Sequence, residues 1–81
     1  MMNAPAAFRY EYEDKTLEEC YQARRDIIDA ICRYEDGDIP DREKYMLPSP
    51  KTIYEMNNLY LKEVCELIEE KLEKLRNEED E

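Results

Sequence analysis

The sequence has 81 residues, 22 of them acidic and 12 basic, which gives a formal net charge of −10. This length permits a single small domain. The acidic excess argues against direct binding to nucleic acid or to anionic lipid, because both kinds of partner require a basic surface.

The composition also limits how so small a domain can be stabilised. A lone hydrophobic core of this size seldom contributes more than about 3–5 kcal/mol. The number of cysteines is odd and all three lie within helical patterns, which argues against a disulfide framework. They are Cys20, Cys32 and Cys65. Histidine is absent and no Cys-x-x-Cys pair occurs, so we predict neither a metal site nor any other cofactor. Association with a second copy or with another protein is the stabiliser that remains.

Residues 1–15 are expected to form an extended N-terminal arm. The segment FRYEYE at 8–13 alternates aromatic and charged side chains, a period of two that is typical of a strand with one buried face. Such an arm could pair with its symmetry mate, dock on the helices, or add to the edge of another protein's sheet. A frayed terminus is the alternative. Tyr10 and Tyr12 are the candidate partner-binding residues of this arm.

The first helix is predicted at about 16–36. Thr16 and Glu19 match a capping box, and apolar residues then recur at spacings of three and four on one face. Gly37, the only glycine, suits a left-handed C-terminal cap. Arg24 interrupts the apolar face: either its stem packs while its guanidinium reaches solvent, or it forms a buried ion pair that fixes helix register or dimer orientation.

The connector at 37–49 is too long for a minimal turn between helices. Its segment PDREKY at 40–45 could form one helical turn. The apolar residues of the connector have two alternative roles: they pack against the helix ends, or they form a binding loop, since long ordered loops are often functional. These residues are Ile39, Tyr45, Met46 and Leu47.

The second helix is predicted at about 50–77, with Ser49 as its N-cap and Pro50 in the first helical position. Two adjacent apolar lines make a stripe wider than a two-stranded coiled coil needs. One line contains Ile53, Met56, Tyr60, Val64 and Leu67, and the other contains Leu61, Cys65, Ile68, Leu72 and Leu75. Residues 78–81 are expected to be an acidic disordered tail, with a short docking element as the alternative.

At a rise of about 1.5 Å per residue, the first predicted helix is roughly 30 Å long and the second is roughly 42 Å long. The first can therefore pair antiparallel with most of the second, while one end and one flank of the long stripe stay uncovered. We predict an all-α fold in which an antiparallel two-helix hairpin dimerises into a four-helix arrangement. The candidate self-association residues are Leu61, Cys65, Ile68, Leu72, Leu75 and Arg24.

Charge and tyrosine content are the functional indications. An acidic surface attracts a protein with a basic surface, although the same charge also serves solubility. Seven of the eight aromatic residues are tyrosines, which suit interfaces as well as the rim of a shallow core. On the long helix, the candidate residues for a basic partner are Glu63, Glu66, Glu70 and Glu73.

The sequence contains no recognisable catalytic arrangement. Without histidine, a cysteine or serine nucleophile lacks its usual base. We therefore expect a protein that is not an enzyme. The start MMNAPAAF has no secretory leader, and no apolar stretch approaches the ~20 residues of a membrane span, so we expect a cytoplasmic protein that does not bind membranes.

These features favour a small regulator or inhibitor that binds a larger basic protein. Phage- and plasmid-encoded inhibitors that block nucleic-acid-binding proteins, some by mimicking the charge of DNA, offer an analogy of class only. The alternative is an oligomerisation module, or a small subunit of a larger complex, that works through its apolar stripe. Added salt should strongly weaken the charge-driven binding of a basic partner. It should hardly change association through the apolar stripe.

Overall fold

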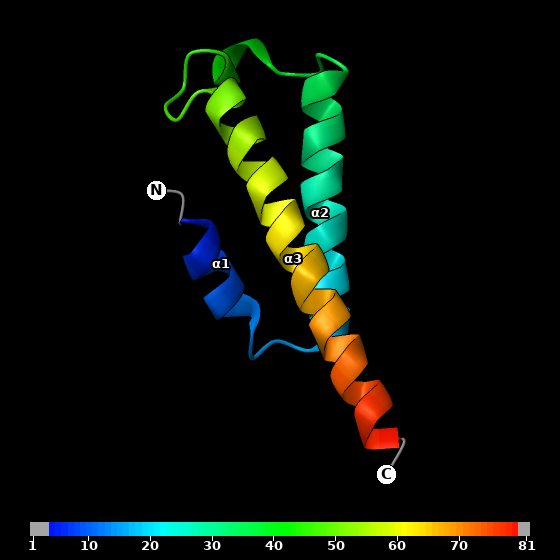
Figure 1. The fold of residues 1–81 in the computed structure, drawn as a ribbon. Helices are drawn as coiled ribbons and strands as arrows, with labels where there is room; N and C mark the ends of the chain where they lie inside the picture. The colour runs from blue at the N-terminus through cyan, green and yellow to red at the C-terminus, as the bar shows by residue number, and fades with distance from the viewer. Residues whose placement is uncertain (1–3, 80–81) are drawn as a thin grey trace.

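The computed structural model describes residues 4–79, so the predictions made for 1–3 and 80–81 fall outside it. The described residues form helices and no strand: α1 (Pro5–Tyr12), α2 (Leu17–Glu35), the 3₁₀ turn η1 (Asp41–Glu43) and α3 (Pro50–Glu79). The expected all-α class is therefore confirmed. The molecule is elongated, with extents of 55 × 23 × 15 Å, because α3 runs along nearly its whole length (Figure 1).

The helices α2 and α3 begin where the sequence places their N-caps. The Thr16 hydroxyl accepts a hydrogen bond from the backbone N–H of Glu19 at 3.1 Å, and the Ser49 hydroxyl accepts one from that of Thr52 at 3.3 Å. Each bond satisfies an N–H group that has no partner within its helix. The helix α3 continues past its predicted end, so the expectation of a disordered tail is wrong for 78–79.

Gly37 ends α2 as the sequence predicts. Its φ is 75°, and the N–H groups of Gly37 and Asp38 donate to the carbonyls of Tyr34 and Arg33 at 3.0 and 2.9 Å. These two bonds form a Schellman motif, which satisfies carbonyl groups at the end of the helix. The chain then enters the connector, whose η1 turn matches the predicted helical turn.

The short helix α1 replaces the extended arm expected over 1–15, so that prediction is wrong. In a helix Phe8 and Tyr12 are four positions apart and share one face. Their rings stack with centroids 4.7 Å apart, and Phe8 also stacks on Tyr60 of α3 at 4.7 Å. Tyr10, two positions from each, stays exposed. The alternating pattern fits a strand and a short helix equally well, and the apolar surface of α3 decides between them.

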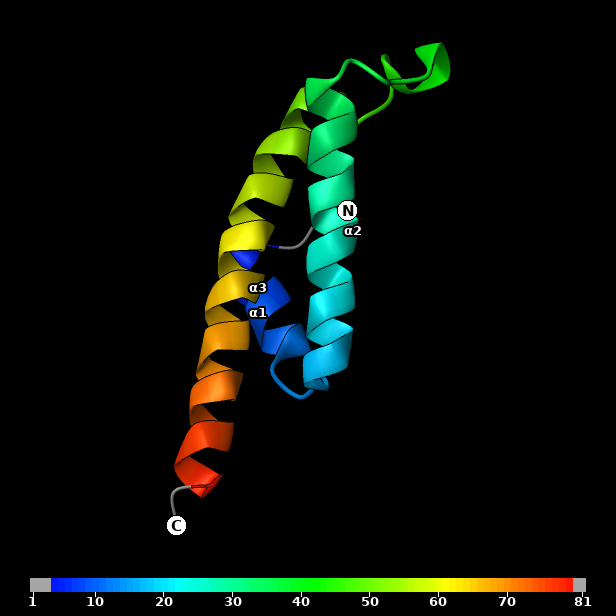
Figure 2. The ribbon, with the colours of Figure 1, turned by 90° about the vertical axis from the view of Figure 1, so that its right-hand side faces the viewer.

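The helix α3 contacts both other helices. In Figure 1, α2 and α3 lie side by side with opposite chain directions, and α1 lies on the other side of α3. Figure 2 shows that the last part of α3 extends beyond the first turn of α2. Lys71 fixes the loop between α1 and α2, because its ammonium group donates a hydrogen bond to the backbone oxygen of Glu13 at 2.7 Å.

The core follows the contact between α2 and α3. Burial of each large apolar side chain contributes about 1.5–3 kcal/mol. The buried residues are Cys20, Ala23, Ile27 and Ile31 from α2, with Tyr60, Val64, Leu67 and Ile68 from α3. Phe8 and Tyr12 of α1 pack against this core. The apolar stripe of α3 is therefore covered on one flank by α2 and on another by α1, and its last turns stay uncovered.

Candidate functional site

Arg9 of α1 lies among three of the glutamates that the sequence assigns to a partner. Its guanidinium is 3.5 Å from the carboxylate of Glu63 and 3.1 Å from that of Glu66, and it also forms an ion pair with Glu70. These glutamates follow one another at spacings of three and four, so they share one face of α3. The hydrogen bond with Glu70 raises the pKa of Arg9. We call this group the Arg9 cluster.

The predicted partner-binding residues do not form one surface. Glu63, Glu66 and Glu70 are held in the Arg9 cluster, where a positive charge offsets part of theirs. Tyr12 is half-buried against the core, whereas Tyr10 is 78% exposed. The sixth residue, Glu73, is exposed farther along α3. A partner that used the three clustered glutamates would have to displace or share Arg9.

The predicted self-association residues fall into two groups. Ile68 is buried, and Leu61 and Cys65 are half-buried. Leu72 and Leu75, in the C-terminal part of α3, are 40% and 47% exposed. The comparison of helix lengths predicted one uncovered end of the stripe without saying which, and the self-association of these residues stays a prediction.

Arg24 does not form the buried ion pair that was one of its two predicted roles. Its guanidinium carbon lies 5.0 Å from the centroid of the Tyr21 ring, a cation–π geometry on its own helix. No carboxylate of residues 4–78 lies within ion-pair distance of it. The half-buried position agrees with a stem that packs and a head group that reaches the surface.

The connector exposes most of its apolar side chains. Tyr45 and Leu47 are each 91% exposed and Met46 is 57% exposed, so for these three a packing role is wrong, while Ile39 is half-buried. Leu47 precedes Pro48, which disfavours a helical conformation of the Leu47 backbone. Exposed apolar side chains are what the binding-loop alternative requires, and that alternative stays a prediction.

A groove of about 270 Å³ lies beside this connector, between the C-terminal end of α2 and the N-terminal end of α3. We call it the connector groove. Tyr34 and Tyr54 are among its lining residues, and their rings stack with centroids 4.4 Å apart. The Tyr54 hydroxyl donates a hydrogen bond to Glu35 at 3.0 Å, which holds this ring in place. The other apolar lining residues are Ala30, Ile39, Met46, Leu47, Pro48, Pro50 and Ile53.

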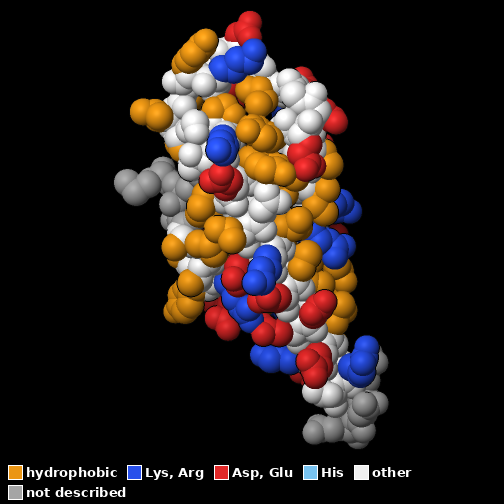
Figure 3. Space-filling model, turned by 45° about the horizontal axis from the view of Figure 1, so that its top comes forward, with side chains coloured by type: hydrophobic (Ala, Val, Ile, Leu, Met, Phe, Trp, Pro, Cys, Tyr) orange, Lys and Arg blue, Asp and Glu red, His pale blue; other side chains and the backbone are white. Residues whose placement is uncertain are grey.

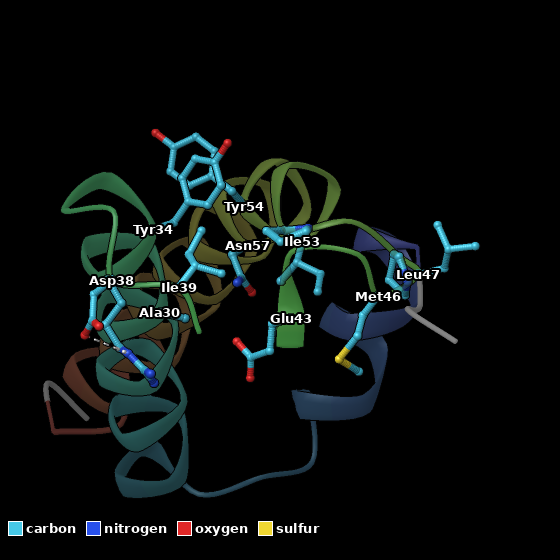
Figure 4. A pocket seen from close by; sticks show the side chains of 13 residues that line it. Ala30, Tyr34, Asp38, Ile39, Glu43, Met46, Leu47, Ile53, Tyr54 and Asn57 are labelled. Atoms are coloured by element: carbon cyan, nitrogen blue, oxygen red, sulfur yellow. Dashed lines mark ion pairs between the residues drawn. The ribbon is translucent and has the colours of Figure 1, made fainter. Parts of the chain in front are cut away.

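The polar groups of the connector groove are few. Arg33 and Asp38 form an ion pair with each other at 3.8 Å. Figure 4 shows Glu43 projecting from η1 into the space between α2 and Met46, with the amide of Asn57 on the α3 side. Among the residues that the structure describes, no Lys or Arg side chain lies within ion-pair distance of Glu43. Its carboxylate is therefore available to a ligand.

The surroundings of the connector groove are acidic. Residues 33–44 contain five acidic and three basic side chains. Of the basic residues, Arg33 pairs with Asp38, Lys44 pairs with Asp41 at 3.0 Å, and Arg42 is exposed outside the lining of the groove. Figure 3 shows apolar side chains gathered at this end of the molecule, with charged side chains around them. An apolar surface with an acidic border suits an amphipathic ligand that carries positive charge.

Sequence reasoning did not find the connector groove, and it named neither Glu43 nor Asn57 as a candidate. The available signal was the run of exposed apolar residues at 45–47, between two helices whose facing ends each carry a tyrosine. That signal does not tell whether the run packs inward or outward, because the direction depends on how the connector crosses between the helix ends.

The cysteines differ in environment. Cys20 is fully buried, and burial raises the pKa of its thiol, whereas Cys32 is exposed and Cys65 is half-buried. Within residues 4–79, no three His, Cys, Asp or Glu side chains gather so that they could hold a metal ion. In the same part of the chain, every helix is too short or too polar to cross a membrane.

Comparisons of the chain with protein-family models, with curated proteins and with solved structures found no match. The geometry of the chain and the chemistry of its side chains are therefore the basis of the functional argument.

Proposed function

We propose that the protein is a small regulator or inhibitor, without enzymatic activity, that binds a larger protein through a basic surface on that partner. The observation that supports the proposal is the connector groove, an apolar surface whose border is acidic. In this proposal α2 and α3 are the two arms of a helical hairpin, and the closed end of the hairpin carries the binding surface. The protein acts in the cytoplasm, where its free thiols stay reduced.

Charge and apolar burial would have different roles in this binding. The net charge of −10 attracts a basic partner over distances of about 10 Å at moderate salt, which raises the association rate. The exposed side chains of Met46 and Leu47 lose contact with water when the partner covers them, which slows dissociation. The Arg9 cluster contributes less to attraction, because its cation lies among the glutamates.

The first test is affinity capture from lysate of the source cells with wild-type protein and two variants of equal charge. The variant Asp36→Asn/Glu43→Gln removes two carboxylates at the connector end. The control Glu18→Gln/Glu69→Gln removes two exposed carboxylates far along α2 and α3 from the connector. We expect the wild type and the control to capture the same basic protein at low salt. The connector variant should not capture it, and about 0.5 M NaCl should release it from the wild type. Equal capture by both variants at both salt concentrations would contradict the proposal.

An oligomerisation module is the second candidate, supported by the exposed Leu72 and Leu75. A second copy that covered these residues would complete a four-helix arrangement. In this case light scattering should give a dimer mass at low and high salt, and Leu72→Ser/Leu75→Ser should give a monomer. Leu59→Ser is the matched control, because Leu59 is 47% exposed on α3 but outside this line. A wild-type monomer at all concentrations would exclude self-association as the function.

A further inference from the structure

The connector groove has a shape that suits a side chain of another protein. Its volume is about 270 Å³, at the lower end of the range of about 300–1,000 Å³ that is typical of small-molecule sites, which leaves room for a single side chain. Apolar side chains from α2, the connector and α3 form its walls. Met46 is 57% exposed at its border and can adapt to an inserted side chain, because methionine is unbranched and flexible.

The charges around the connector groove indicate the sign of the charge that a ligand should carry. The cation Arg33 is already paired with Asp38, and Lys44 with Asp41. The carboxylate of Glu43, which lines the groove, has no such partner among the residues described. A ligand that brings a cation next to its apolar group therefore gains a charge-assisted hydrogen bond. A ligand that brings a carboxylate meets repulsion instead.

We propose that the connector groove binds a short segment of a partner protein that inserts one apolar side chain between α2 and α3 and places a neighbouring Lys or Arg on Glu43. This inference rests on the proposed function and names the class of ligand. The apolar side chain supplies most of the contact, and Glu43 discriminates between basic and acidic segments. Charge complementarity excludes a second copy of this acidic chain as the preferred occupant.

The test uses three synthetic peptides of about eight residues, built on glycine and serine. The first carries a leucine and a lysine about four positions apart. The second has glutamate in place of the lysine, and the third has serine in place of the leucine. Amide NMR spectra of the full chain, recorded during titration with each peptide, report both the affinity and the place of binding.

We expect the leucine–lysine peptide to shift the amide signals of Ile39, Ile53 and Asn57 saturably. The glutamate and serine peptides should each bind at least about tenfold more weakly, because one loses the charge pair and the other the buried group. Signals of Leu72 should stay unchanged with all three. Shifts that map to the end of α3, or equal affinity for the three peptides, would overturn the inference.

Two variants identify the contribution of single side chains. Glu43→Gln should weaken binding of the leucine–lysine peptide about fivefold to tenfold and remove most of the preference for lysine over glutamate. Met46→Ser should weaken binding of both leucine peptides alike. Glu69→Gln, an exposed acid farther along α3 and outside the lining of the groove, should leave the affinities unchanged. An unchanged preference for lysine in Glu43→Gln would remove Glu43 from the site.

The proposed function and the proposed class of ligand can be disproved separately. If the peptides do not bind the groove, but salt and Asp36→Asn/Glu43→Gln still release a basic protein in the capture experiment, this inference is wrong and the proposed function stands. If the peptides bind as expected but the captured protein is insensitive to both changes, the proposed function is wrong and only the peptide-binding groove remains.

Discussion

Arg9 changes how the acidic residues of α3 are interpreted. Their sequence pattern is that of a solvated face open to a partner. In the structure Glu63, Glu66 and Glu70 gather around one guanidinium, which joins α1 to α3. Individual ion pairs at a surface contribute little, but several carboxylates around one arginine form a network. The first function of these side chains is therefore to hold α1 in place.

The variant Arg9→Met tests this function. We expect the amide hydrogens of α1 to exchange several-fold faster, because the helix keeps its stacked rings but loses its ion pairs. Hydrogen-exchange mass spectrometry measures the effect. Arg42→Met, at an exposed arginine of the connector, is the control and should leave α1 unchanged. Unaltered exchange in Arg9→Met would show that aromatic packing alone holds this helix.

Cys20 makes stability depend on pH. Burial raises the pKa of its thiol in the folded protein above the value of about 8.5 that thiols have in unfolded chains. Between these two pKa values the unfolded chain has released the proton and the folded chain has not, so stability falls as pH rises. The contribution is fully present below about pH 8.5 and is lost as pH rises through the folded pKa.

We therefore expect the difference in unfolding free energy between wild type and Cys20→Ala to shrink as pH rises from about 7 to about 10. Urea unfolding at several pH values measures this difference. Val64→Ala, which shortens a fully buried side chain without a titratable group, is the control, and its difference from wild type should stay constant over the same range. A constant difference for Cys20→Ala would mean that the buried thiol ionises as it does in the unfolded chain.

Among the elements, α2 and α1 show two different causes of helix formation. The helix α2 has a side-chain N-cap and a Schellman motif, so its own residues define both ends. The helix α1 has eight residues, and Ala4 at its N-cap provides no side-chain hydrogen bond. Isolated helices this short are unstable in water. Contacts with α3 are therefore what make residues 5–12 helical.

Gly37 offers a direct test of the end of α2. Gly37→Ala should lower the free energy of unfolding by about 1 kcal/mol, because alanine disfavours a positive φ. No heavy atom lies within 4 Å of the position that a Cβ would occupy, so the cost comes from the backbone and not from a clash. Gly37→Asn should cost less, since asparagine tolerates this conformation. Urea unfolding checks both variants, and a stabilised Gly37→Ala would contradict the capping argument.

At the scale of the whole molecule, self-repulsion opposes folding. The net charge is −10, and the ion pairs between described residues are few. Folding brings the acidic side chains closer together, which destabilises the compact state. The same charge disfavours contact between two copies, so a dimer must bury enough apolar surface around Leu72 and Leu75 to exceed this repulsion.

Added salt should therefore stabilise the protein. Raising NaCl from about 0.02 to about 0.5 M shortens the Debye length from tens of ångströms to a few, which screens the long-range repulsion. We expect the urea midpoint of wild type to rise. It should rise further in Arg9→Met, which lacks the Arg9 cluster that salt would weaken. A falling midpoint would mean that attractive ion pairs outweigh the net repulsion.

The sequence by itself determined the all-α class and the ends of α2 and the start of α3. Thr16, Gly37 and Ser49 act through hydrogen bonds and backbone preferences that involve only neighbours along the chain. The comparison of helix lengths also predicted that one end of the longer helix stays uncovered, because the rise per residue is fixed. These features are local or additive, so a single sequence contains them.

Only the tertiary structure decided the conformation of 5–12, the partner of the acidic residues of α3, and the outward direction of the connector. Arg9 and Glu66 are 57 positions apart, so no local pattern relates them. FRYEYE is too short to separate a period of two from a helical period, and the choice falls to the ring of Tyr60 beneath Phe8. The connector groove likewise exists only because the end of α2 meets the start of α3, a long-range contact that no residue preference contains.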